Sequence, residues 1–191
     1  MRRLALILSA LLLAALGAAA PAYAYSYAAA GAEPLLDGRE ALFAAASAGN
    51  WPAAQTALAA MQPDLDYLEG HEDPGIAGIF SAAMAAQDAK QLEAAFARAA
   101  SAEVERRING ARDNLADYQT AKVLVVKAQR FYTAIAADLA PDASKAVADG
   151  LQRALDAIGN PGVFGVGARK PDPAAFATAR ADILKALGKA P

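Results

Sequence analysis

Alanine is the feature of this sequence that most restricts its fold, since it accounts for 56 of the 191 residues. Alanine has the highest helix propensity of the amino acids, and its small side chain lets neighbouring helices approach closely. Valine, isoleucine and threonine, which favour strands, are sparse after the first 24 residues. No stretch alternates apolar and polar residues at the period of two that a strand requires. The chain is therefore predicted to be all-α.

Apolar residues at helical spacing, interrupted by short glycine or proline breakers, predict an antiparallel bundle of about six or seven helices. We expect Pro63 to bend or split the second helix and Asn109-Gly110 to close or kink the fourth. The expected helices cover approximately residues 34–47, 52–68, 74–84, 88–108, 113–139, 147–158 and 176–187.

Two segments 38 residues apart resemble each other. Ala48-Gly49-Asn50 precedes a helix that reaches Leu58, and Ala86-Gln87-Asp88 precedes a helix that reaches Phe96. This spacing predicts two successive helix-turn-helix hairpins in the first part of the domain, of the tetratricopeptide-like kind. Chance similarity between alanine-rich helices is the alternative explanation.

The first 24 residues have the pattern of a secretory signal peptide. Arg2 and Arg3 precede an apolar run over 4–20, and residues 21–24 (Pro-Ala-Tyr-Ala) end in a small-x-small cleavage site. We expect export to the periplasm by the general secretory route, with cleavage after Ala24. An uncleaved anchor is the alternative, although the run falls just short of the roughly 18 apolar residues of a spanning helix.

After the predicted cleavage site, we expect a flexible tail over residues 25–32 and a single helical domain over 33–191. No second long apolar stretch follows, so we expect no membrane insertion of the mature chain. The formal net charge is −2, and loss of two arginines with the leader makes it more negative. This charge disfavours nucleic acid or an anionic membrane surface as a partner. The absence of cysteine excludes disulfides and thiolate ligands.

The segment 63–74 gathers the single histidine and five carboxylates. Like charges at helical spacings of three and four repel each other, and a bound cation would reverse that cost. Carboxylates with one imidazole and one phenol suit iron, manganese, zinc or copper(II). The candidate metal ligands are Glu69, His71, Glu72 and Asp73, supported by Asp66 and Tyr67.

The same acidic residues also have an ordinary structural interpretation. Carboxylates near the start of a helix complement its dipole, and Asp73 before Pro74 can cap the third helix. Asp113 and Asp117 could complete a metal site from across the bundle, or they could stabilise the start of the next helix.

Catalysis has little support, because cysteine is absent and no Ser-His-Asp order exists. We therefore expect a non-enzymatic protein without catalytic residues. Glu103 and Arg107 are expected to form an ion pair on a solvated helix face.

The long loop 159–173 does not match a phosphate-binding pattern, and no strand precedes it. Val163, Phe164 and Val166 suggest that this loop packs back onto the bundle. Arg169 and Lys170 could meet the acidic segment or a partner.

Residues 41–108 resemble the extracytoplasmic helical segment of bacterial oxidase-dependent iron permeases. The similarity lies in Ala48-Gly49-Asn50, in Tyr67-Leu68-Glu69-Gly70-x-Glu72 and in Leu92-Glu93-Ala94-Ala95-Phe96. In that family the second motif belongs to a periplasmic region associated with iron handling. The transmembrane helices of the permeases and their Arg-Glu-x-x-Glu motifs are absent, and His71 stands where an apolar residue is expected.

Together these observations predict a periplasmic metal-binding or metal-delivery protein that acts with a membrane transporter or another periplasmic protein. Iron is the first candidate metal. The alternative is a helical-repeat-like protein–protein interaction module without metal. That module would hold its partner in a helical hairpin or at the loop 159–173.

Overall fold

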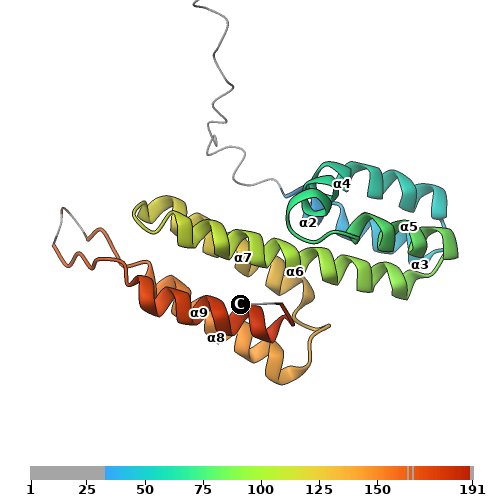
Figure 1. The fold of residues 1–191 in the computed structure, drawn as a ribbon. Helices are drawn as coiled ribbons and strands as arrows, with labels where there is room; N and C mark the ends of the chain where they lie inside the picture. The colour runs from blue at the N-terminus through green and yellow to red at the C-terminus, as the bar shows by residue number, and fades with distance from the viewer. Residues whose placement is uncertain (1–32, 163, 165, 190–191) are drawn as a thin grey trace, which may run out of the picture. The chain divides into compact units, whose positions relative to one another are not determined.

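The computed structural model describes residues 33–162, 164 and 166–189, and all its regular secondary structure is helical. The predicted signal peptide and tail lie outside the described residues. From Glu33 onward the chain forms one compact unit (Figure 1). Its helices are α2 (Pro34–Asp37), α3 (Arg39–Ser47), α4 (Trp51–His71), α5 (Ile76–Ala86), α6 (Ala89–Asp113), α7 (Tyr118–Ile135), α8 (Pro141–Ala157) and α9 (Pro173–Ala186). The predicted all-α bundle is confirmed.

The central helix is α6, which packs against α3, α4 and α5 on one side of the bundle and against α7 and α9 on the other. Buried alanines recur along it, and their small side chains let the neighbouring helices approach. Helices α3, α4 and α5 and the α8–α9 pair therefore lie on opposite sides of the α6–α7 pair (Figure 1).

The two predicted hairpins are present and have matching turns. Gly49 after α3 and Gln87 after α5 both adopt a left-handed backbone, with φ of +70° and +50°. The next residue in each turn, Asn50 or Asp88, donates its N–H to a carbonyl five residues back, at 2.8 and 3.1 Å. The same two side chains cap α4 and α6, as the sequence predicted for Asp88.

Several predicted helix boundaries differ from the structure. Pro63 does not split α4, because its solvent-exposed position lets water satisfy the freed carbonyl and because buried leucines on both sides hold the helix. Helix α6 continues through Asn109-Gly110 to Asp113. The next helix begins at Tyr118, with four residues between it and the end of α6, and Asp117 caps its first turn.

Candidate functional site

The acidic segment lies at the end of α4 and in the turn before α5, and Glu69 stabilises that turn. Its carboxylate accepts hydrogen bonds from the backbone N–H groups of Gly75, at 2.9 and 3.0 Å, and Ala77, at 2.9 Å. The bonds from Ala77 and Gly75 lower the pKa of Glu69 below its ordinary value. Glu69 therefore supplies acceptors for the start of α5.

Asp73 joins the same turn to two other parts of the domain. It accepts hydrogen bonds from Arg98 of α6 at 2.6 and 3.0 Å and forms an ion pair with Lys189 at 3.2 Å. The hydrogen bond from Arg98 is the main reason that the pKa of Asp73 is lowered. This carboxylate is thus paired with two cations.

His71 and Tyr67 stack on the surface of α4, with ring centroids 4.5 Å apart. The Nδ1 atom of His71 lies 3.0 Å from the carbonyl oxygen of Tyr67, and the guanidinium of Arg106 lies 4.9 Å from the Tyr67 ring centroid. Asp66 accepts a hydrogen bond from Gln62 at 2.7 Å. The structure brings Tyr67 and His71 together, but the carboxylate of Asp66 bonds to Gln62, one turn earlier in α4.

Glu72 differs from its neighbours because burial raises its pKa, against a lowering influence of Arg106. Glu105 and Glu103 add to the increase. Asp113 pairs with Arg112 at 2.8 Å, and Asp117 caps α7. Among the described residues, no group of three or more histidine, aspartate or glutamate side chains is arranged to hold a metal ion.

A buried ion cluster, which the sequence did not reveal, joins the start of the domain to α6 and α7. Glu33 pairs with Arg107 and with Lys127, each at 2.7 Å, and Glu103 pairs with Arg107 at 3.1 Å and with Arg106 at 2.8 Å. The predicted Glu103–Arg107 pair is confirmed, but its placement on a solvated face is wrong. The side chains of Glu103 and Arg107 are only 1% and 5% exposed because Glu33 and α7 cover them.

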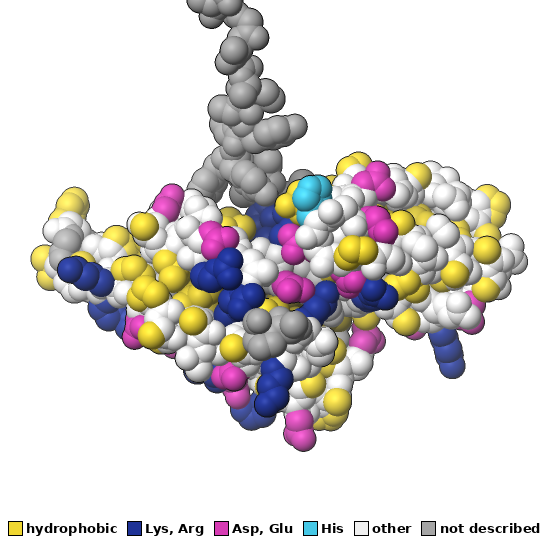
Figure 2. Space-filling view, in the orientation of Figure 1, with side chains coloured by type: hydrophobic (Ala, Val, Ile, Leu, Met, Phe, Trp, Pro, Cys, Tyr) yellow, Lys and Arg dark blue, Asp and Glu magenta, His cyan; other side chains and the backbone are white. Residues whose placement is uncertain are grey.

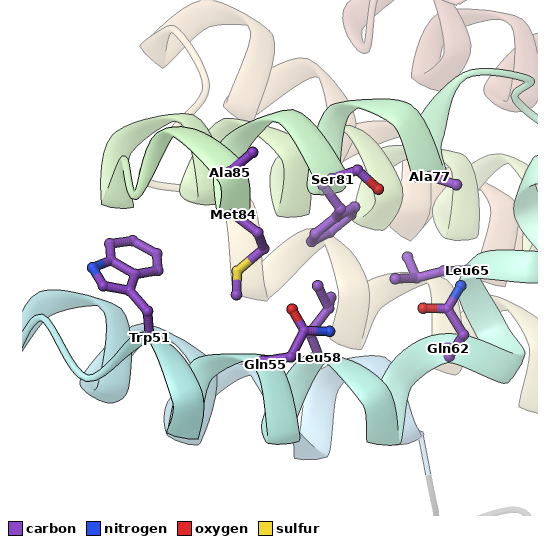
Figure 3. Close-up of a pocket in the computed structure, with 10 residues that line it drawn as sticks. Trp51, Gln55, Leu58, Gln62, Leu65, Ala77, Ser81, Met84 and Ala85 are labelled. Carbon is purple, nitrogen blue, oxygen red and sulfur yellow. The ribbon is translucent and has the colours of Figure 1, made fainter.

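A groove lies between α4 and α5 and has a volume of about 420 Å³. From α4 it is lined by Trp51, Gln55, Leu58, Gln62 and Leu65. From α5 it is lined by Ala77, Phe80, Ser81, Met84 and Ala85. The α4 residues recur every three or four positions, so they share one face of that helix. Figure 3 shows Trp51, Gln55 and Leu58 extending from α4 towards α5, with Met84 extending from α5 towards them.

No lining residue of this α4–α5 groove carries a charge, and its floor is formed by the buried Leu58, Leu65 and Phe80. Gln55, Gln62 and Ser81 are exposed and bring amide and hydroxyl groups to it. The accessible lining is therefore about half polar and half apolar, a combination that can bind the side chain and the backbone of a peptide. The regular spacing of the glutamines with Trp51 and Leu58 is the sequence signal that could have indicated it.

The loop 159–172 is held at its base by backbone hydrogen bonds. Asn160 and Arg169 exchange two bonds, of 2.9 and 2.8 Å, and Asp172 donates its N–H to Ala157 at 2.8 Å. Gly159 has a φ of +80°, and a side chain there would collide with the backbone of Arg169. The base of the loop therefore requires glycine at this position.

The expectation that the loop packs back onto the bundle is wrong for Phe164 and Val166. Phe164 is fully exposed and Val166 is 79% exposed. Val163 lies outside the described residues. Figure 2 shows hydrophobic side chains at the outer end of this loop, on the left, and positive side chains nearer its base. We call Phe164 and Val166 the loop tip.

Comparisons with protein-family models, curated proteins and solved structures give no match to this chain. The resemblance to the iron permease segment therefore stays a prediction from the sequence. Among the described helices, none combines the length and the apolar character that a membrane crossing needs.

Proposed function

We propose that this protein is a helical interaction module that binds an apolar, uncharged segment of a peptide or protein in the α4–α5 groove. The observation that carries the proposal is the groove of about 420 Å³ with an apolar floor and a lining without charge. A volume of this size lies near the lower end of the range of about 300–1,000 Å³ for binding pockets. The groove suits one large apolar side chain together with the backbone on either side of it.

The polar groups at the groove support a peptide rather than a purely apolar ligand. The amides of Gln55 and Gln62 can each donate and accept hydrogen bonds, as peptide groups require. An incoming charged side chain would lose water without gaining an ionic partner from the lining, which makes its binding unfavourable. The leader predicted at residues 1–24 would place this module in the periplasm.

The geometry gives less support to metal delivery. Glu69 and Asp73 already accept hydrogen bonds from other parts of the domain, and a metal ion would have to replace those contacts. Metal binding by His71 and Glu72 stays a prediction, which calorimetry with iron, manganese, zinc and copper salts tests directly. Heat that is lost in the double variant His71→Ala, Glu72→Ala would support it.

Trp51 offers a direct measurement of groove binding, since it lines the groove and is the single tryptophan of the chain. The probes are capped peptides that differ only at a central phenylalanine, leucine, lysine or aspartate. We expect a saturable change in tryptophan emission with the phenylalanine and leucine peptides alone. Ser81→Arg, at an exposed lining position, should weaken this binding at least tenfold.

Ala82→Arg is the matched control, because Ala82 is exposed on the same helix and does not line the groove. This variant should bind the peptides as the unmodified protein does. Equal binding of all four peptides, or full binding by Ser81→Arg, would contradict the proposed site.

A further inference from the structure

The loop tip is the most exposed apolar surface among the described large side chains. Phe164 is fully exposed and Val166 is 79% exposed, whereas Tyr67 and Val126 are 44% and 41% exposed. Exposed apolar side chains that gather at one protruding place often mark a contact with a partner. The pinned base of the loop, formed by the Asn160–Arg169 pair, keeps this tip away from its own bundle.

The α4–α5 groove has the complementary properties. It is apolar at its floor, uncharged in its lining, and large enough for an aromatic side chain. Asp66 accepts a hydrogen bond from the lining residue Gln62 and so places a carboxylate beside the groove. On the loop, Arg169 and Lys170 are exposed a few residues from Phe164. The charges beside the tip and beside the groove are therefore opposite in sign.

The loop cannot reach the groove of its own chain. The groove belongs to α4 and α5 on one side of the α6–α7 pair, and the loop joins α8 and α9 on the other side (Figure 1). Hydrogen bonds at residues 157, 160, 169 and 172 close the loop at its base. Only a second copy could bring this tip to this groove.

We propose that the loop tip of one copy binds in the α4–α5 groove of a second copy, with Phe164 in the groove. This inference rests on the proposed function of the groove and names its occupant. The two contacting surfaces are different, so the interface is heterologous and leaves a tip and a groove available for further copies unless the assembly closes into a ring. Burial of the aromatic ring accounts for an affinity gain of about 10- to 100-fold.

Sedimentation velocity tests the proposal on protein that begins at Tyr25. The unmodified protein should gain mass as its concentration rises from micromolar to millimolar. Phe164→Ser removes the aromatic side chain of the loop tip, and Ser81→Arg blocks the groove. Each variant alone should therefore be monomeric. An equimolar mixture of the two should form a one-to-one complex, because it retains one intact tip and one intact groove that can meet. Recovery of binding in the mixture also shows that both variants are folded.

Val126→Ser and Ala82→Arg are the controls, since they change an exposed apolar side chain of α7 and an exposed position of α5 outside the groove. Both should associate as the unmodified protein does. Association that persists in Phe164→Ser would overturn the inference. Protein that stays monomeric at millimolar concentration, or that binds anionic vesicles through Phe164 instead, would overturn it as well.

The outcome also separates this inference from the proposed function. If the phenylalanine peptide changes the Trp51 emission but the protein does not associate with itself, the groove binds peptides and its partner is another protein. If neither binding is observed, both the groove function and the self-association are wrong.

Discussion

The α8–α9 pair and the α4–α5 pair are packed in opposite ways. In α8, Gly150 lies so close to α9 that a Cβ atom there would be 2.5 Å from Cγ1 of Ile183. Between α4 and α5, large residues such as Trp51 and Met84 leave a groove of about 420 Å³. A small residue at the contact point lets one pair close, whereas bulky and amide side chains keep the other pair apart. The α4–α5 pair therefore leaves space that a partner could fill, whereas α8 and α9 are in close contact at Gly150.

The largest expected effect comes from adding one methyl group to the closed pair. Gly150→Ala should lower the free energy of unfolding by about 1–3 kcal/mol, because the new methyl group overpacks the contact with Ile183. Urea unfolding followed by circular dichroism measures this change. If the variant is as stable as the unmodified protein, α9 can move away from α8 at little cost. The contrast between the closed pair and the open pair would then be wrong.

The same substitution in the open pair should have the opposite sign. A Cβ atom at Gly78 of α5 would meet no atom within 4 Å, so Gly78→Ala gains helix propensity without a collision. We expect about 0.5–1 kcal/mol of added stability in the same urea experiment. A loss of stability here would mean that α5 is more tightly packed than the groove suggests.

The start of the open pair also depends on pH through Asp73. Because the folded protein lowers the pKa of this carboxyl, the ion pairs with Arg98 and Lys189 stabilise the fold above the unfolded value of 3.8 and lose effect as the pH falls through the lowered pKa. Asp73→Asn should therefore cost about 0.2–1 kcal/mol at pH 7. That cost should disappear once the pH lies below the lowered pKa of Asp73. Hydrogen exchange at the Gly75 amide should be faster in Asp73→Asn than in the unmodified protein, over the same pH range in which the variant is less stable. Exchange in α9 should be the same in both proteins.

Glu72, one residue away, should show the smallest effect and the reverse pH dependence. Its pKa is raised, so the folded protein binds the proton more tightly than the unfolded chain does, and stability falls as the pH rises through the raised pKa. Glu72→Gln should stabilise the protein at pH 7 by less than about 0.5 kcal/mol, with the gain disappearing below pH 4.5. Glu93→Gln, on an exposed part of α6, is the control. A pH-independent gain would rule out this mechanism.

The helices and the first hairpins could be predicted because they depend on neighbours in the sequence. Alanine propensity, apolar spacing and the capping residue Asp88 act within one or two turns of a helix. The second helix was harder, since Pro63 disfavours a continuous helix locally while the buried Leu58 and Leu65 on either side favour it. Packing in the folded domain outweighed the local preference of one residue.

The candidate site was less predictable, because burial depends on residues far away in the sequence. Glu103 and Arg107 have the spacing of a surface pair, and Glu33 and α7, from other parts of the chain, enclose them. The acidic segment has the density of charge that suggests a metal site, but Arg98 and backbone N–H groups supply partners for Asp73 and Glu69. The exposure of Phe164 follows from the conformation of the loop base, which apolar content alone does not indicate.

The buried cluster also sets an order of events during synthesis. Glu33 is made first, and its partner Arg107 follows 74 residues later. At a synthesis rate of about 5–20 residues per second, that interval is roughly 4–15 s. During this time the carboxylate of Glu33 lacks Arg107 and Lys127, so α3, α4 and α5 can pack together before that carboxylate is buried. The complete cluster can form only when the chain as far as Lys127 is available, and α8 and α9 still follow it in the sequence.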